Sequence, residues 1–233
     1  MSWQELANDY SIVNALREKA PGGFGLGETN GCPIDPSVEG GLNTAIKCGW
    51  YYFGGSGTIA NAPSIPNGSY GSLLVTSRGA GNTITQMCFF ETYTTIAIRY
   101  KFGSEWQPWE YLNPPMTLGV EYRTTERYLG KPVYCKVIDC GVITANTQKI
   151  IVQSIPVLDV LSCEGVIHTN SNGHNQATPF DYQPANGTKY SVTVSAEAYN
   201  QSEEDKLNIY VNSFWAVTGS VYAIVRYTKE TDQ

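Results

Sequence analysis

The sequence is poor in charge. Lysine, arginine, aspartate and glutamate make up 15% of its 233 residues, against about 25% in a typical soluble domain. The net charge of −6 leaves no basic stripe that could neutralise phosphates, which excludes sequence-independent binding of nucleic acid. No window approaches the roughly 18 consecutive apolar residues of a membrane span, so membrane insertion is not expected.

The first residues lack a basic segment followed by an apolar one, so we expect no secretory leader and a chain that folds in a reducing cytoplasm. The six cysteines include no Cys-x-x-Cys pair, and we expect buried free thiols. Cys135 and Cys140 lie five apart in a strand-like run, so their side chains point to opposite faces and cannot bridge. No cofactor and no metal site are predicted.

Aromatic and other apolar residues are plentiful instead. There are 16 tyrosines, 5 tryptophans and 7 phenylalanines, and the apolar fraction of 42% is enough to bury a core. One amphipathic helix is predicted over residues 2–19, because Trp3, Leu6, Tyr10, Val13 and Leu16 recur at spacings of three and four. Residues 20–41, rich in glycine and proline, are expected to form an irregular linker.

Short strand-like runs separated by glycine-rich turns fill residues 42–112, which predicts a small all-β module. The expected strands are Cys48–Phe53, Ser72–Ser77, Thr83–Glu91, Thr94–Lys101 and Trp106–Leu112. Asn113-Pro114-Pro115 then marks a domain boundary, since consecutive prolines cannot continue a strand ladder.

A second all-β series follows from residue 116. Residues 128–131 supply a Leu-Gly turn. Two later runs alternate apolar with polar residues. In the first, Val192, Val194 and Ala196 alternate with Ser, Thr and Glu, and in the second, Leu207, Ile209 and Val211 alternate with Asn, Tyr and Asn. Val221–Tyr227 is apolar on both faces, which favours a central strand covered on both sides. This pattern predicts a two-sheet, jelly-roll-like sandwich. The polar stretch Val166–Asp181 is expected to be a long surface loop, where binding residues often lie.

Several of these segments resemble bacteriophage tail-fibre proteins. Val120–Asp139, VEYRTTERYLGKPVYCKVID, and the closing VYAIVRYTKETDQ resemble the two ends of the C-terminal domain of many tail-fibre tips. Upstream, Gly49-Trp50-Tyr51-Tyr52 together with Arg99 and Trp106-Gln-Pro-Trp109 is similar to the knob-type module of phage fibres and R-type pyocins. The two resemblances span about 190 residues.

The resemblance implies a non-catalytic, homotrimeric receptor-binding protein of a phage or phage-derived tail, located in the virion tail. In this interpretation residues 1–41 form a stem or attachment segment that contacts other tail or baseplate proteins. Residues 42–115 form the knob-like module, and residues 116–233 form the β-sandwich tip. The expected partner is a bacterial surface polysaccharide or surface protein.

Glycan binding requires flat aromatic faces and a few amide or carboxylate groups. Two sets of residues supply them. In the knob-like module the candidates are Trp50, Tyr52, Tyr93, Arg99, Trp106 and Trp109. In the tip they are His168, Asn170, Asn172, His174, Asn175, Asp181 and Tyr182. For both sets an ordinary structural role, in the core or in a solvated loop, stays open.

Two other kinds of function stay open. A glycan depolymerase would need paired carboxylates, whereas the acidic residues here are few and scattered, with no Gly-x-Ser-x-Gly elbow. A structural tail or baseplate component would trimerise without binding a ligand. The two histidines, His168 and His174, lack the converging partners of a metal site.

Overall fold

The computed structural model describes residues 32–33, 40–54, 59–64, 70–78, 83–91, 94–169, 175–178, 180–182, 190–199, 206–214 and 218–232. The predicted helix over residues 2–19 and most of the predicted linker lie outside these ranges. Within them the fold is all-β, since one four-residue 3-10 helix is the only regular element that is not a strand. The chain divides into two compact units, Met1–Pro115 and Met116–Gln233, on either side of the double proline.

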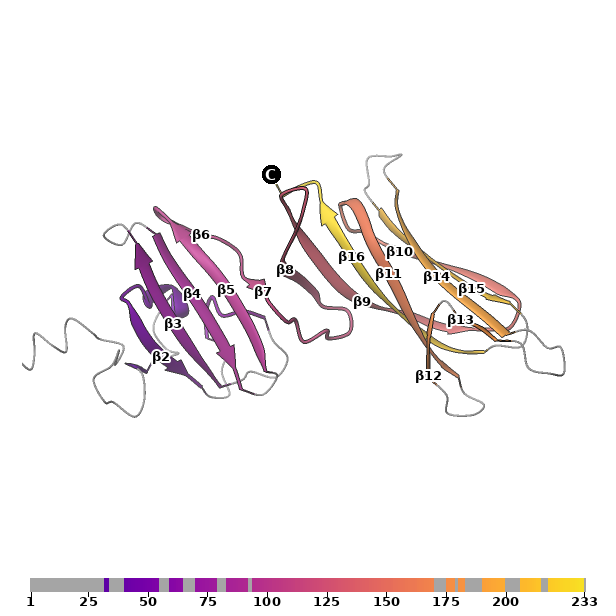
Figure 1. Ribbon diagram of the computed structural model, residues 1–233, viewed down its shortest axis with the longest axis horizontal. Coiled ribbons are helices and arrows are strands. Elements are labelled where there is room, and N and C mark those ends of the chain that lie inside the picture. Colours follow the sequence, from indigo (N-terminus) through magenta and orange to yellow (C-terminus); the bar gives the residue numbers. More distant parts are fainter. Residues whose placement is uncertain are drawn as a thin grey trace, which may run out of the picture. The chain divides into compact units, whose positions relative to one another are not determined.

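The first unit is built on one sheet of short strands (Figure 1). Its elements are β1 (Cys32–Pro33), η1 (Gly41–Thr44), β2 (Gly49–Phe53), β3 (Gly71–Arg78), β4 (Thr83–Phe90), β5 (Thr95–Phe102), β6 (Glu105–Trp106) and β7 (Glu110–Tyr111). The strands follow the order β1-β2-β3-β4-β5-β7, and β6 also pairs with β5. Every pair is antiparallel except β1 with β2.

Four of the predicted strands are confirmed to within one residue at either end, and the fifth is divided. The run expected over 106–112 forms two short strands, β6 and β7, with Gln107-Pro108-Trp109 between them. Pro108 has no N–H to give to the ladder, which explains the interruption. The predicted linker is wrong where it meets the unit, because Cys32–Pro33 is a strand and Gly41 begins the 3-10 helix.

The first unit buries only one face of its sheet. Alternate residues of β3, β4 and β5 point to that face, where η1 also contributes Leu42. Its apolar core comprises Leu42, Ala45, Phe53, Leu73, Val75, Ile84, Cys88, Phe90 and Ala97. Gln86, Thr95 and Arg99 are buried polar residues on the same face, and Gln86 Nε2 donates to the carbonyl oxygens of Leu42 at 2.7 Å and of Ala45 at 2.9 Å. These bonds fasten η1 to the middle of the sheet.

The second unit is a sandwich of two sheets. Its strands are β8 (Glu121–Tyr128), β9 (Lys131–Ile143), β10 (Thr147–Gln153), β11 (Val157–Thr169), β12 (Asn175–Thr178), β13 (Phe180–Tyr182), β14 (Tyr190–Tyr199), β15 (Lys206–Phe214) and β16 (Gly219–Lys229). One sheet has the order β8-β9-β16-β11-β12 and the other β10-β15-β14-β13. The pairing is nested, because β9 pairs with the last strand and β10 with the next to last. This nesting gives the jelly-roll-like character that the sequence predicts.

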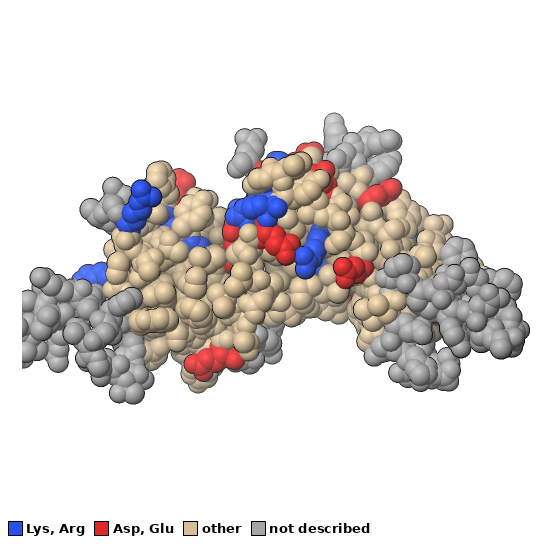
Figure 2. All heavy atoms as spheres, in the orientation of Figure 1, with Lys and Arg blue, Asp and Glu red and all other residues tan. Residues whose placement is uncertain are grey.

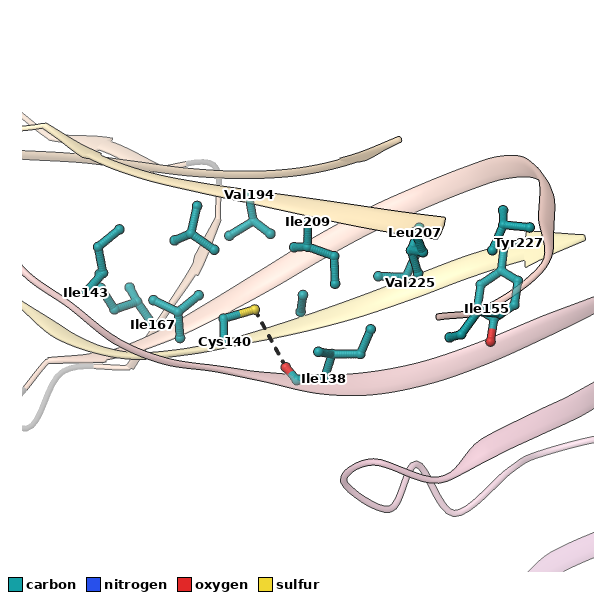
Figure 3. Close-up of a cluster of buried hydrophobic side chains, with 14 of the residues drawn as sticks. Ile138, Cys140, Ile143, Ile155, Ile167, Val194, Leu207, Ile209, Val225 and Tyr227 are labelled. Carbon is teal, nitrogen blue, oxygen red and sulfur yellow. Dashed lines mark hydrogen bonds between the residues drawn. The ribbon is translucent and has the colours of Figure 1, made fainter. Parts of the chain in front are cut away.

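The two sheets enclose one apolar core (Figure 3). The predicted alternation is confirmed in β14 and β15, where Val192, Val194, Ala196, Leu207, Ile209 and Val211 belong to this core or pack against it. The cluster includes Ile138, Cys140, Ile143, Ile167, Val192, Val194, Leu207, Ile209, Val211, Val221, Ala223, Val225 and Tyr227. The polar residues of β14 and β15 therefore lie on the outer face of their sheet.

β16 is a central strand, as predicted, with β9 on one side and β11 on the other. The expectation that both of its faces are covered is wrong. Val221, Ala223 and Val225 are fully buried, whereas Tyr222 and Ile224 on the other face are half-buried and Arg226 is exposed. The predicted turn between β8 and β9 is confirmed at Leu129-Gly130, both with positive φ.

The predicted surface loop over 166–181 is wrong in its described parts. β11 continues to Thr169, and β12 and β13 follow. Ile167 is fully buried while His168 is exposed, so this stretch alternates like any half-buried strand. Its polar outward residues conceal the alternation in the sequence.

The cysteines are free within the described residues, and Cys88, Cys135 and Cys140 are buried as predicted. Cys48 contradicts the expectation, since it is exposed. Cys140 belongs to the sandwich core, whereas Cys135 contacts Met116 at 3.7 Å between the two sulfur atoms. Burial raises the pKa of both Cys135 and Cys140 to about 11, as expected for unreactive structural thiols.

Candidate functional site

The uncovered face of the first unit's sheet is aromatic and apolar. Two rows of directly paired residues cross it: Trp50, Leu74, Met87 and Ile98, and beside them Tyr52, Ser72, Phe89 and Ile96. A third row holds Thr76, Thr85 and Tyr100. We call these three rows the aromatic face. These rows contain no charged residue themselves, but on the same face Glu110 pairs with Ile98 at one edge and Arg78 lies in the next row. Figure 2 shows few charged atoms over the middle of this unit.

The largest side chains of the aromatic face are open to solvent. Trp50 is 38% exposed, Tyr52 is 43% exposed and Tyr100 is 49% exposed. Trp50 also leans on Phe89, with ring centroids 5.8 Å apart and an interplanar angle of 37°, which limits its freedom to turn. Trp50 and Tyr52 are two residues apart on β2, so their rings lie on the same side at a spacing of roughly 7 Å.

Contiguous apolar patches exposed on a protein surface often mark interaction sites, so this face is a candidate binding surface. Its rings could stack on the C–H side of a sugar, with the hydroxyl groups of Ser72, Thr76 and Thr85 beside them. Sequence reasoning singled out Trp50 and Tyr52 but missed the rest of the face. In β4 both alternating sets mix apolar and polar residues, and in β5 the more apolar set, Ile96, Ile98, Tyr100 and Phe102, is the outward one, so alternation alone did not identify the buried set.

Arg99 lies on the opposite, buried face of the same sheet. Its Nε and Nη2 donate to Gln86 Oε1 at 2.9 and 2.8 Å, and Nη2 also donates to Asn43 Oδ1 at 2.8 Å. The guanidinium carbon is 4.2 Å from the ring centroid of Trp106 and 4.3 Å from that of Trp109. The sequence-predicted trio of Arg99, Trp106 and Trp109 is therefore brought together, away from Trp50 and Tyr52.

The arrangement assigns Arg99 a positioning role. It is only 5% exposed, and burial lowers its pKa to about 10, so it remains protonated at neutral pH. Its charge is balanced by hydrogen-bond acceptors and by the faces of two indoles. Trp109 is further fixed by a hydrogen bond from Nε1 to the carbonyl oxygen of Asn61 at 2.9 Å. Both indoles are half-buried, so each presents an edge to solvent in a fixed orientation.

The candidates of the tip are divided between the two sheets of the sandwich. His168 is exposed on β11, and its ring lies 5.3 Å from that of Tyr222 at an interplanar angle of 62°. Asn175 on β12 is its direct cross-strand partner. Asp181 and Tyr182 instead belong to β13 in the other sheet. The remaining candidates, Tyr93, Asn170, Asn172 and His174, lie outside the described residues.

A polar cluster that sequence reasoning missed fastens the end of the sandwich. The Glu121 carboxylate accepts hydrogen bonds from Tyr227 Oη and Lys229 Nζ. The Lys229 ammonium lies 4.4 Å from the ring centroid of Tyr134, which stacks on Tyr227 at 6.0 Å. Burial raises the pKa of Tyr134 to about 12 and that of Tyr227 still further. These groups tie β8 to β16, and both tyrosines stay neutral over the physiological range.

No cluster of three or more potential metal ligands occurs among the residues that the structure describes. In the same part of the chain, no helix has the length and apolar character needed to cross a membrane.

Comparison with known proteins gives two structural neighbours. A scan of protein-family models finds no match, and a search of curated proteins finds none either. Among solved structures, a C-terminal part of the R2 pyocin fibre of P. aeruginosa is 10% identical over 83% of this chain, with a TM-score of 0.29; this chain spans 65% of its length. An N-truncated R2-type pyocin tail fibre is 12% identical over 84% of this chain and 94% of its own, with a TM-score of 0.26. At such scores the likeness carries no argument for the fold or function of this chain.

Proposed function

We propose that the protein is a tail-fibre-type receptor-binding protein that recognises a bacterial surface glycan without catalysis. The observation that carries the proposal is the aromatic face, with Trp50 and Tyr52 exposed side by side on a mainly uncharged surface. The resemblance of residues 120–139 and of the closing segment to tail-fibre tips supports it. In this proposal three chains associate in the tail of a phage or phage-derived particle, and three weak sites act together through avidity.

Aromatic stacking accounts for the proposed selectivity. A ring that is already exposed and partly held in place loses little conformational freedom when a sugar stacks on it. The hydroxyl groups of Ser72, Thr76 and Thr85 can orient the sugar by hydrogen bonds. Each contact is weak, so removal of two rings should affect binding far more than it affects folding.

The test is adsorption of the fluorescently labelled chain to a panel of bacterial strains. We expect the variant Trp50→Ala/Tyr52→Ala to lose at least tenfold in binding to the strain that wild type recognises. Tyr128→Ala is the matched control, because it removes a tyrosine that is 42% exposed in the second unit. Equal binding by wild type and the double variant would overturn the role of the aromatic face.

A structural component without a ligand is the second candidate, favoured by the breadth of the aromatic face. Leu74, Met87, Phe89, Ile96 and Ile98 extend it well beyond what one sugar ring covers, and a second copy of the chain could bury it. Light scattering on the same double variant separates the two. A fall in the mass of the particle would favour assembly through this face, whereas unchanged mass with lost adsorption would favour glycan binding.

A depolymerase is distinguished by its product. We propose that the protein releases no new reducing ends from the capsular or cell-wall polysaccharides of a strain to which it binds. An increase in reducing ends over time would replace the proposal with a hydrolase.

A further inference from the structure

The smaller sheet of the second unit carries an outer surface that none of the candidates above includes. Strand pairing places nine outward residues in a grid across β10, β15 and β14 (Figure 1). The rows are Gln148, Asn212 and Thr193; Ile150, Tyr210 and Ser195; and Val152, Asn208 and Glu197. We call these nine residues the amide face. The alternating residues Ile151, Val194, Ala196, Ile209 and Val211 belong to the sandwich core or pack against it, so the nine point away from it.

The composition of the amide face departs from that of an ordinary solvated sheet. Asn208 and Asn212 lie within β15, which is paired on both sides, although asparagine is disfavoured in strands. Ile150 and Val152 are 53% and 52% exposed on the neighbouring strand. Residues that fit their local structure poorly without helping the core are expected at functional sites.

The polar side chains of this face are held by one another. Tyr210 Oη donates a hydrogen bond to Glu197, and Asn212 Nδ2 donates to Thr193 Oγ1 at 3.4 Å. These contacts join neighbouring strands and limit the rotamers of the amide and phenol groups. A preorganised set of donors and acceptors binds a ligand at a lower entropic cost than freely rotating ones.

The chemistry of the face selects its ligand. Each amide offers both donors and an acceptor, repeated about 4.8 Å apart across strands and roughly 7 Å along them, which suits the closely spaced hydroxyl and acetamido groups of sugars. Tyr210, with Ile150 and Val152 beside it, offers an apolar strip for the C–H side of a ring. Glu197 is the one charged residue among the nine, and Lys206, the next outward residue of β15, lies beside its row on the same face. The face therefore carries no excess of positive charge that would attract anionic polymers, which favours neutral or amino sugars.

We propose that the amide face binds a neutral or amino-sugar glycan. This inference rests on the proposed function, glycan recognition, but places a second and chemically distinct binding surface on the other unit. The aromatic face would contribute stacking with few polar contacts. The amide face would contribute hydrogen bonds, with no excess of positive charge to attract anionic polymers.

The test uses the full chain and an array of bacterial oligosaccharides in three groups: neutral, amino-sugar, and anionic through uronic acid or phosphate. We expect wild type to bind members of the first two groups. The variant Tyr210→Ala/Asn212→Ala should weaken that binding at least tenfold. Ser195→Lys, which adds bulk and charge at an exposed central position without removing a contact, should do the same and is the variant least apt to disturb folding. Val142→Ala, on β9 and 53% exposed, is the control and should leave binding unchanged.

The outcomes separate this inference from the proposed function. If binding is lost in Trp50→Ala/Tyr52→Ala and kept in both amide-face variants, the amide face is overturned and the proposed function stands. Binding confined to the anionic group would also overturn the amide face. If wild type binds neither the array nor any bacterial strain, both proposals fail. Circular dichroism and the melting temperature of each variant show whether a loss of binding reflects a loss of fold.

Discussion

Gln86 is the residue on which the interior of the first unit depends. Its amide nitrogen donates to two carbonyl oxygens next to η1, and its amide oxygen accepts from Arg99. It is fully buried, so removing the amide would take a hydrogen-bond partner from each of these groups in a place without access to water. A buried network that is fully satisfied stabilises, and one that is half satisfied costs more than an apolar core.

We expect Gln86→Leu to lower the free energy of unfolding by about 3 kcal/mol or more, because it removes the side-chain donor to the Leu42 and Ala45 carbonyls and leaves the buried Arg99 guanidinium with Asn43 as its remaining hydrogen-bond partner. Urea denaturation followed by tryptophan fluorescence measures this, since Trp106 and Trp109 lie against Arg99. Thr85→Ala, the neighbouring outward position, should change stability by less than about 0.5 kcal/mol. Similar effects of the two substitutions would contradict the role of the network.

Residue roles were the hardest part of the site to predict. Trp50, Arg99 and Trp106 were grouped as one set of glycan candidates because aromatic and basic residues share that chemistry. The sheet places Trp50 on one face and Arg99 with Trp106 on the other. Odd and even positions show which residues of different strands share a face only when the pairing register between the strands is known. A single sequence does not give that register.

At the scale of elements, β9 depends on a bulge. Its pairing with β16 shifts between Asp139 and Gly141, so Cys140 has no partner of its own. Gly141 has a φ of +68°, and its N–H donates to Asp139 Oδ1 at 2.7 Å. Because of the extra residue, the inward side chains switch from even-numbered positions, Ile138 and Cys140, to the odd-numbered position Ile143.

We expect Gly141→Ala to destabilise the second unit by about 1 kcal/mol or more, because alanine is strained at this φ. Thermal unfolding measures the change. Val142→Ala, at the next and exposed position, serves as the control and should shift the midpoint little. A melting temperature that Gly141→Ala leaves unchanged would argue that β9 can pair with β16 without the bulge.

Most elements were predictable because hydrophobic alternation and turn residues are local properties. The strands β2 to β5 and the hairpin turn at Leu129-Gly130 are examples. The continuation of β11 through His168 was not predictable in this way. Its outward residues are polar, and what keeps the segment extended is pairing with β16, more than 50 residues later in the sequence.

At the scale of the whole molecule, the number of chains in the assembly decides how the two binding faces act. The proposed trimer predicts a native mass of three times 25.6 kDa by light scattering, resistant to mild heating in detergent. A monomeric mass would contradict the trimer, while the two glycan-binding faces could still be tested on the single chain. Each face would then have to act without avidity.

The central position of β16 has a consequence for biosynthesis. The strands β9 and β11 do not pair with each other, and the place between them is filled by residues that the ribosome adds only after β12 to β15. Until then both carry backbone groups without their final partners, a state that invites pairing with other chains. Folding of this sheet is therefore expected to be slow and to await the synthesis of β16. A high local concentration of nascent chains would favour aggregation, so slow expression at low temperature should raise the yield of native protein.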